Sequence, residues 1–389
     1  MRVAQRTARF TESVIREMTR LIDAYPGRGI NLAQGFPDFE VPQELRDAAC
    51  AAIQAGLNQY SVTWGAPSLR RAIAEKVVRF GGPQFDPDRE ITVTCGSTEA
   101  MAAALLALVD PGDEVIIFAP YYENYWPDTV LAGASPRFVL LRPPDWSFDP
   151  DELRTAFARH PRAIIVNTPN NPTGKVFSHD ELSLIAGLCQ EYDVLAITDE
   201  IYEHLVYEGQ HISLATLPGM RERTVTISGI SKTFSVTGWR VGYVLAPAQL
   251  SDAIRKVHDF LTVAAPSPFQ AAAEVALRLD ARYYADLLAG YRQRRAYFIP
   301  ALQELGFRCR PPTGAYYVLA GIEAFGDLDD VTFAKELVRR CGVAVVPGSS
   351  FYPEPAMGRT LVRFSFPKKL ETLQEAVARL RVGLPTMLP

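Results

Sequence analysis

The sequence predicts an α/β protein with a large domain, built on a mainly parallel, doubly wound sheet, and a smaller α+β domain. Short Val/Ile-rich runs alternate with longer helical patterns from about residue 91 to 246, which is typical of βαβ units. The pattern changes after about residue 280. In addition, 389 residues exceed what one ordinary hydrophobic core serves, and a hydrophobic content of 48% can fill two cores.

The alternating region contains the runs that we predict as strands of the large sheet. In chain order they are 91–95, 114–118, 136–140, 163–167, 194–198, 224–228 and 241–246. Beyond residue 280 we predict a long charged helix over 283–305, and then strands at 306–310, 314–320, 342–348 and 361–367 with helices interspersed. We therefore expect residues 45–279 to form the large domain, and residues 1–44 together with 280–389 to form the small one.

Composition and charge exclude several classes of protein. The net charge is −4 and no basic block is present, so nucleic acid is not an expected partner. No apolar run approaches the ~20 residues that span a bilayer, and Glu12 and Glu17 interrupt the arginine-rich start of the chain, which favours a solvated arm over a transit peptide. We therefore expect a soluble protein without a membrane partner.

The cysteines and histidines argue for a cytoplasmic protein without a dedicated metal. The five cysteines are widely spaced and form no Cys-x-x-Cys pair, which fits reduced thiols in a cytoplasm. The five histidines show neither a His-x-x-x-His pattern nor a His/carboxylate spacing of a metal site.

Unusual polar clusters follow five of the predicted strands. The clusters are 96–100 ("GSTEA"), 120–125 ("PYYENY"), 167–174 ("NTPNNPTG"), the pair Asp199 and Glu200, and the segment around Lys232. The carboxyl ends of parallel strands meet at one edge of an open α/β sheet, and this edge is where such sheets bind ligands. We therefore expect the five clusters to lie close together.

Each cluster also has an ordinary structural interpretation. Residues 96–98 precede an apolar helix and could be an N-cap, and "NNPTG" is a plausible turn. Asp199 could be a satisfied carboxylate at a strand end, and Tyr122 a core aromatic residue. Lys232 and Arg240 alone could be two solvated charges in a surface loop.

Taken together, the clusters fit one phosphorylated ring aldehyde. The amine of Lys232 can hold an aldehyde, while Arg240 and the helix N-terminus at 96–98 can bind a phosphate. A buried Asp199 can keep a proton on a ring nitrogen, and Tyr122 can stack on the ring. These are the protein contacts of pyridoxal phosphate.

The segment "SKTFSVTGWRVGY" resembles the lysine signature of class I/II aminotransferases, the fold-type-I pyridoxal phosphate enzymes. The resemblance covers nearly the whole chain and includes "INLAQGFPDF", "NQYSVTWGAPSLR", "LVDPGDEVIIFAPYYENY", "VNTPNNPTGKVFS", "ITDEIYEHLVY" and "VRFSFPK". Within this family the chain is most similar to kynurenine/glutamine–phenylpyruvate aminotransferases and to methionine or succinyl-diaminopimelate aminotransferases.

The resemblance implies catalytic roles for three residues. Lys232 would carry the cofactor as a Schiff base and act as the base once the amino acid has displaced it. Asp199 would pair with the pyridine nitrogen, and Tyr202 with the ring hydroxyl oxygen. The full set of implied cofactor contacts is Tyr60, Gly96, Ser97, Thr98, Tyr122, Asn171, Asp199, Tyr202, Ser228, Ser231, Lys232 and Arg240.

Two of these contacts have a particular consequence. Tyr60 of "NQY" would reach the phosphate of the neighbouring subunit, which implies a homodimer with shared active sites. The chain departs from many relatives at Gly229, where they have a serine. Either Ser228 or Ser231 would therefore supply the hydroxyl that contacts the phosphate.

The implied substrates are an L-amino acid and a 2-oxo acid. Arg363 would hold the substrate α-carboxylate, helped by Asn171 and the backbone at Gly35. Aromatic candidates for the side-chain pocket favour neutral, aromatic or sulfur-containing amino acids or glutamine; they are Phe36, Trp64, Tyr122 and Tyr125. The alternatives are an aspartate aminotransferase, a C–S β-lyase of cysteine conjugates, and a non-catalytic sensor, which usually needs an attached DNA-binding domain.

Overall fold

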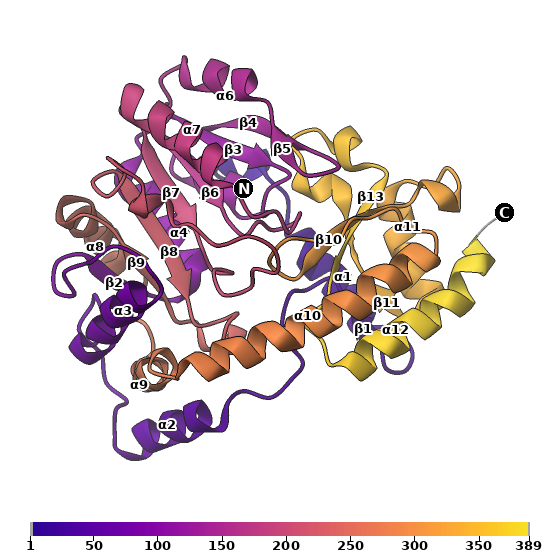
Figure 1. Ribbon diagram of the computed structural model, residues 1–389, viewed down its shortest axis with the longest axis horizontal. Coiled ribbons are helices and arrows are strands. Elements are labelled where there is room, and N and C mark those ends of the chain that lie inside the picture. Colours follow the sequence, from indigo (N-terminus) through magenta and orange to yellow (C-terminus); the bar gives the residue numbers. More distant parts are fainter. Residues whose placement is uncertain (1–2, 388–389) are drawn as a thin grey trace.

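The computed structural model describes residues 3–387 and confirms the α/β class (Figure 1). Its main sheet has eight strands in the order β2-β9-β8-β7-β6-β3-β4-β5. These strands are β2 (Ile91–Thr94), β3 (Glu114–Ala119), β4 (Ser135–Arg142), β5 (Ser147–Phe148), β6 (Ala163–Asn167), β7 (Leu195–Asp199), β8 (Thr224–Gly229) and β9 (Gly242–Leu245). All the strands predicted between residues 91 and 246 are present.

The pairing within this sheet is mostly parallel, as predicted. The neighbours from β8 through β7, β6 and β3 to β4 all pair in parallel. β9 runs antiparallel to both β8 and β2, so β2 points the same way as β8, and β5 is antiparallel to β4. The carboxyl ends of β2, β3, β6, β7 and β8 therefore lie at one edge of the sheet.

Both faces of the sheet are covered, which explains its continuous apolar strands. Every residue of β6, β7 and β8 is buried, as expected for parallel strands between layers of helices. Side chains alternate between two cores, with Ile116 and Ile164 in one and Ile117 and Ile165 in the other. The accompanying helices are α2 (Gln43–Gln54), α3 (Pro67–Arg79), α4 (Gly96–Leu108), α5 (Tyr125–Leu131), α6 (Pro150–Phe157), α7 (His179–Glu191), α8 (Ala248–Thr262) and α9 (Ser267–Leu277).

A second group of elements joins the two ends of the chain. The long helix α10 (Ala281–Glu304) leads from the main sheet to it, and Figure 1 shows the indigo N-terminal elements beside the yellow C-terminal ones. β1 (Ile30–Asn31) pairs in parallel with β11 (Val343–Ala344). The remaining elements are β10 (Tyr317–Gly321), β12 (Val346–Pro347), β13 (Leu361–Ser365), α1 (Val14–Asp23), α11 (Asp330–Glu336) and α12 (Leu370–Gly383).

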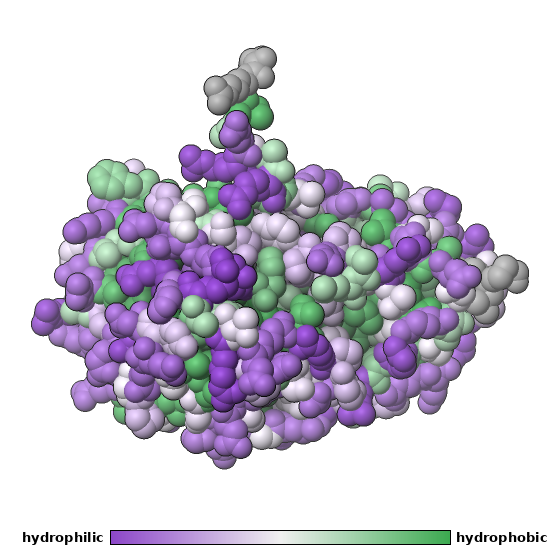
Figure 2. Space-filling model, turned by 90° about the horizontal axis from the view of Figure 1, so that it is seen from above, coloured by the Kyte–Doolittle hydropathy of each residue, from purple (hydrophilic) through white to green (hydrophobic). Residues whose placement is uncertain are grey.

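Short turns of helix complete the described chain. The 3₁₀ turns are η1 (Gln5–Arg9), η2 (Leu214–Thr216), η3 (Thr237–Trp239), η4 (Glu323–Phe325), η6 (Gly348–Phe351), η7 (Pro355–Gly358) and η8 (Leu384–Met387), and η5 (Leu337–Cys341) is a π-helix. Figure 2 shows hydrophilic residues over most of the face that it presents, with hydrophobic ones between them. Among residues 3–387, no helix combines the length and apolar character that crossing a membrane requires.

Two sequence-based strand predictions need correction. The strand predicted at 306–310 is wrong, because only Arg308 pairs there, in an isolated bridge with Gly321. The strand predicted at 342–348 is divided in two, since β11 pairs with β1 whereas β12 pairs with β13. The partner of β11 lies near the start of the chain, so local patterning carried no information about the division.

Candidate active site

Lys232 lies between β8 and β9, in the turn that follows the carboxyl end of β8. Its Nζ donates a hydrogen bond to the carbonyl oxygen of Gly35 (3.2 Å), which also accepts from the hydroxyl of Tyr316 (2.9 Å). Burial lowers the pKa of Lys232 to about 8, and the positive charges of Arg240 and Arg363 act in the same direction. A larger share of this amine is therefore neutral and nucleophilic near pH 8 than in an exposed lysine.

Asp199 is the last residue of β7 and is held in place on both sides. Its Oδ2 accepts from the hydroxyl of Tyr125 (2.7 Å) and its Oδ1 from the backbone N–H of Ile201 (3.3 Å). The side-chain amide of Asn167, at the end of β6, donates to the backbone oxygen of Asp199 (2.9 Å). Burial raises the pKa of Asp199 to about 6, so the carboxylate would be stabilised by a cationic partner such as a protonated ring nitrogen.

Arg363, on β13, is fully buried and its charge is not matched by a carboxylate in its hydrogen bonds. Its Nη1 donates to Oδ1 of Asn171 (2.9 Å) and its Nη2 to the carbonyl oxygen of Ala33 (2.5 Å). The guanidinium lies over the rings of Tyr317 (4.5 Å) and Phe351 (4.9 Å). Its Nε has no hydrogen-bond partner in the described chain. A buried guanidinium in this state fits a carboxylate ligand, which would offer it a matching charge.

The N-terminus of α4 and the side chain of Arg240 converge on one point. Gly96 has φ +82°, and a Cβ there would lie 2.4 Å from Nη2 of Arg240. A Cβ at Gly242 would lie 2.5 Å from the carbonyl carbon of Gly96 and 2.6 Å from the backbone nitrogen of Ser97. Gly96 therefore lets the guanidinium approach the helix N-terminus, Gly242 lets β9 pack against it, and together the guanidinium and the helix N-terminus suit a phosphate. Thr98 lies in the same first turn of α4.

A group of tyrosines connects Lys232 to Arg363. The hydroxyls of Tyr202 and Tyr317 share a hydrogen bond of 2.9 Å, and the rings of Tyr202 and Tyr316 meet edge to face at 5.1 Å. Burial raises the pKa of Tyr202 well above its usual value, so its hydroxyl stays protonated and able to donate. A Cβ at Gly35 would lie 2.1 Å from the Tyr317 hydroxyl oxygen, which explains why a glycine is needed there.

Tyr122, predicted to stack on the cofactor ring, is linked to Asp199 by way of Tyr125. The rings of Tyr122 and Tyr125 meet edge to face at 5.7 Å, and Tyr125 is bonded to Asp199. Most predicted site residues thus surround one region at the carboxyl edge of the sheet. The roles that the resemblance implied for them remain predictions.

Two predicted contacts lie away from this region. The hydroxyl of Ser228 donates to Oε1 of Glu203 (2.7 Å), and Glu203 forms an ion pair with Nζ of Lys76 (2.6 Å). Ser228 is thus engaged elsewhere, which leaves Ser231 as the serine next to Lys232 that is available to a phosphate. Tyr60 is 85% exposed, so its predicted reach across a subunit boundary remains a prediction.

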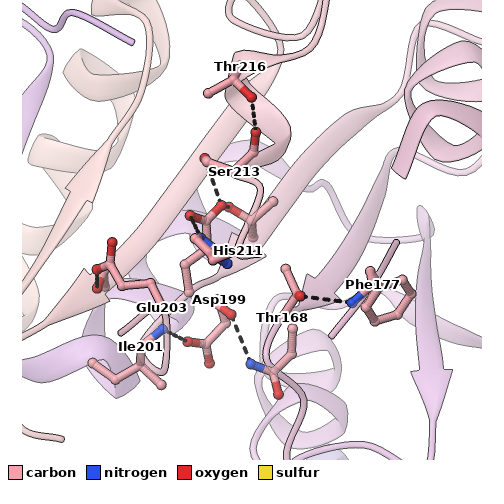
Figure 3. Close-up of polar contacts among 12 residues, drawn as sticks. Thr168, Phe177, Asp199, Ile201, Glu203, His211, Ser213 and Thr216 are labelled. Atoms are coloured by element: carbon pink, nitrogen blue, oxygen red, sulfur yellow. Dashed lines mark hydrogen bonds and ion pairs between the residues drawn. The ribbon is translucent and has the colours of Figure 1, made fainter. Parts of the chain in front are cut away.

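Sequence reasoning missed a polar network directly behind the site. Glu200 accepts hydrogen bonds from Thr198 and Ser213 (2.9 Å each), and its other oxygen lies 2.9 Å from Nε2 of His211. In Figure 3, His211 and Ser213 lie above Asp199, with Glu203 to one side. The one available signal was the position of Glu200 next to Asp199, because its partners His211 and Ser213 follow more than ten residues later in a loop.

Sequence reasoning also missed what anchors Asp199 and Gly35. Tyr125 was expected to line the side-chain pocket, yet its hydroxyl bonds Asp199. The sequence predicts Tyr316 and Tyr317 only as part of a strand. The adjacent tyrosines in "GAYYVLA" were the available signal, because two phenols in one buried run require polar partners.

Together these residues fit pyridoxal phosphate. The site offers a lysine amine with a lowered pKa, a buried carboxylate and a buried guanidinium with an unpartnered Nε. It also offers an anion cradle, formed by the helix N-terminus at Gly96 and Ser97 and by the guanidinium of Arg240. On a mostly parallel α/β sheet, this set defines a fold-type-I pyridoxal phosphate enzyme.

Comparison with known proteins specifies the family. Residues 28–380 match the family described as aminotransferase class I and II. The chain is 41% identical to a probable N-succinyldiaminopimelate aminotransferase of Mycobacterium tuberculosis, covering 91% of this chain and 92% of that protein. It is 40% identical to methionine aminotransferase of Escherichia coli (91% and 92% covered) and 39% identical to human kynurenine–oxoglutarate transaminase 1 (90% and 92%).

Solved structures agree with this assignment. N-succinyldiaminopimelate aminotransferase of M. tuberculosis superimposes with a TM-score of 0.94 at 39% identity, covering 98% of this chain and all of that one. An aspartate aminotransferase of Thermus thermophilus bound to maleate gives 0.90 at 33% identity, covering 98% and 100%. The chain belongs to the class I and II aminotransferases and is a pyridoxal-phosphate-dependent transaminase.

Proposed function

We propose that this transaminase takes its amino group from a neutral L-amino acid, with sulfur-containing, aromatic or glutamine side chains preferred, and passes it to a 2-oxo acid. The observation that carries the proposal is Arg363, a buried guanidinium whose Nε has no partner within residues 3–387. It suits the α-carboxylate that all these substrates share. Relatives named for methionine and kynurenine support the neutral side chain.

The cation nearest to the predicted pocket residue Phe36 supports the same preference. Lys368 is only 3% exposed. Its Nζ donates to the carbonyl oxygen of Phe36 (2.8 Å) and lies 3.5 Å from the centre of that ring. An ammonium held beneath an aromatic ring is poorly placed to bind a second carboxylate, so aspartate should be a weak substrate.

In the proposed mechanism, each residue has a defined task. When bound, pyridoxal phosphate supplies an aldehyde that holds the amino group and a ring that withdraws electrons. Nζ of Lys232 would hold the aldehyde, and its free amine would accept the proton of the substrate Cα. Asp199 would hold the proton on the ring nitrogen, and Tyr202 would donate to the ring hydroxyl oxygen. Arg363 and Asn171 would bind the substrate carboxylate.

The anion cradle has the remaining task of holding the phosphate. The N–H groups of Gly96, Ser97 and Thr98, the hydroxyl of Ser231 and the guanidinium of Arg240 would bind it. C–S β-elimination, the alternative reaction, is not favoured, because the relatives are named as aminotransferases.

We also propose an arrangement of domains and subunits. Residues 45–279 would form the cofactor-binding domain, and residues 1–44 with 280–389 the small domain, since β1 pairs with β11. Tyr60, 85% exposed, would complete the phosphate site of the partner in a homodimer. Five free cysteines suit a cytoplasmic location.

The test is a single half-reaction scanned over amino acids. The holoenzyme is mixed with methionine, glutamine, phenylalanine, kynurenine or aspartate, and the loss of the aldehyde-form absorbance of the cofactor gives kcat/KM for each. We expect the neutral substrates to exceed aspartate clearly. If aspartate wins, the substrate proposal is wrong but the reaction class stands.

A further inference from the structure

One buried histidine connects the phosphate cradle to the loop that carries Tyr60. His258, on α8, has no exposed surface. Its Nδ1 lies 3.1 Å from both carboxylate oxygens of Glu99, and its Nε2 lies 2.9 Å from the carbonyl oxygen of Thr63. The imidazole therefore bridges α4 and the loop that precedes α3.

Both contacts of His258 require a proton on the ring. A carboxylate and a carbonyl oxygen only accept hydrogen bonds, so a ring that donates to both is an imidazolium, with the hydroxyl of Thr262 also 3.2 Å from Nδ1. Burial by itself would lower the pKa of His258, but the hydrogen bond and charge of Glu99 raise it overall. The ion pair is enclosed, so the ring is held in one orientation.

The Glu99 end of this bridge reaches the cradle. Oε2 of Glu99 accepts a hydrogen bond from the backbone N–H of Cys95 (3.0 Å). Cys95 is the N-cap of α4 and directly precedes Gly96, where the guanidinium of Arg240 approaches. The carboxylate of Glu99 therefore fixes the turn from which the N–H groups of α4 point toward the phosphate.

The Thr63 end of the bridge reaches the loop of Tyr60. Two further side chains of α8 contact the same loop: Asp259 accepts from the Thr63 hydroxyl (3.3 Å), and the guanidinium of Arg255 lies 5.1 Å from the ring centre of Trp64. Among these three side chains of α8, His258 is the one that binds the backbone of the loop, and the hydroxyl of Ser267 binds it closer to Tyr60, at the carbonyl oxygen of Gln59 (2.6 Å). Tyr60, three residues earlier, is left free to point outward.

We propose that His258 is a positioning residue that couples the two phosphate contacts of the shared site. Through Glu99 it sets the cradle of its own subunit, and through Thr63 it sets the loop that presents Tyr60 to the partner's phosphate. This inference rests on the proposed homodimer with shared sites. It predicts that His258 and Tyr60 act on cofactor affinity together and not independently.

A double-mutant cycle tests the coupling. His258→Phe keeps the ring volume but removes both hydrogen bonds, and Tyr60→Phe removes one hydroxyl. The cofactor-free proteins are titrated with pyridoxal phosphate to obtain Kd. We expect about a ten-fold or larger rise in Kd for His258→Phe and a smaller rise for Tyr60→Phe. In the double variant, Kd should rise by clearly less than the product of the two single fold-changes.

His179 provides the matched control, because it is an exposed histidine on α7. His179→Phe should leave Kd unchanged, and the double variant of His179→Phe and Tyr60→Phe should have the same Kd as Tyr60→Phe alone. An unchanged Kd for His258→Phe, a silent Tyr60→Phe, or a double variant equal to the product would overturn the proposal. Should His258→Phe fail to fold, His258→Gln takes its place in the cycle, since an amide can donate to only one of the two acceptors at a time. Turnover of methionine by the wild type is measured alongside, so that a failed coupling is not confused with a wrong function.

Discussion

At the scale of single residues, burial changes the chemistry of the Lys232 amine. An ammonium loses solvation when it is buried, and the nearby charges of Arg240 and Arg363 disfavour it further. Asp199 opposes this effect but does not cancel it. This suits the two roles proposed for Lys232, as a nucleophile toward the cofactor aldehyde and as a base toward the substrate.

This shift predicts how Lys232 reacts with pH in the cofactor-free protein. With a pKa of about 8, its neutral fraction, and hence its rate of reductive methylation, should rise through pH 8 and level off above it. An unperturbed lysine with a pKa of ~10.4 keeps gaining reactivity to higher pH. Peptide mass spectrometry measures the rate at Lys232 against a reference lysine peptide in the same tube. Parallel pH profiles for the two lysines would show that burial does not depress this pKa.

A second prediction concerns Arg363. Arg363→Lys keeps the charge but cannot reach Asn171 and the backbone of Ala33 while also holding a carboxylate with two parallel hydrogen bonds. We expect a loss of ~1.5–3 kcal/mol, roughly ten- to a hundred-fold in kcat/KM, for every amino acid tested. Arg359→Lys is the control, because Arg359 is exposed just before the same strand. A loss confined to some amino acids would place Arg363 at the side chain and not at the α-carboxylate.

At the scale of elements, the site depends on how closely β9 approaches the start of α4. Gly242, the first residue of β9, leaves no room for a side chain against Gly96 and Ser97. The backbone contact between strand and helix fixes the direction of the helix N-terminus. The cradle is therefore a product of packing between two elements and not of one loop.

Substitution of this glycine should weaken cofactor binding. In Gly242→Ala the new Cβ would overlap backbone atoms that cannot rotate away, so α4 must shift, and we expect Kd for pyridoxal phosphate to rise about ten-fold or more. Gly238→Ala is the matched control, since nothing lies within 4 Å of its Cβ position. Both are titrated as cofactor-free proteins. Equal affinities for the two variants would show that the strand contact does not set the cradle.

These elements also show what the sequence could and could not predict. The buried strands and the polar residues at their carboxyl ends could be predicted, because the alternation of apolar runs with helical patterns and the direction of each strand are local properties of the sequence. The role of Tyr125 was not, because its partner Asp199 is 74 residues away. The same holds for the division between β11 and β12, whose partners lie at opposite ends of the chain. The sequence could not distinguish Ser228 from Ser231 as the candidate phosphate contact, because the hydrogen bond from Ser228 to Glu203 depends on the fold.

At the scale of the whole molecule, the proposed homodimer would cover side chains that are exposed in the single chain. Tyr60 is 85% exposed, and Phe260, at the end of α8, is 92% exposed. Figure 2 shows a segment at the N-terminal end standing away from the body of the molecule, and η1 contains no buried residue.

The proposed homodimer with shared active sites predicts that activity depends on the dimer. We expect specific activity to fall with dilution as the dimer dissociates, and Tyr60→Phe to raise the Kd of the cofactor in the dimer. Analytical ultracentrifugation paired with activity at matched concentrations is the measurement. A demonstrably monomeric sample that keeps the full specific activity would contradict the shared site.

The central claim is that Lys232 holds pyridoxal phosphate in this transaminase, and peptide mapping after borohydride reduction tests it most directly. Reduction makes the bond between lysine and cofactor permanent, so protease digestion and mass spectrometry then identify the modified residue. We expect one stoichiometric label, on Lys232, that disappears when the holoenzyme is first converted with methionine. A label on another lysine, or no lysine-linked cofactor in an active preparation, would contradict the account.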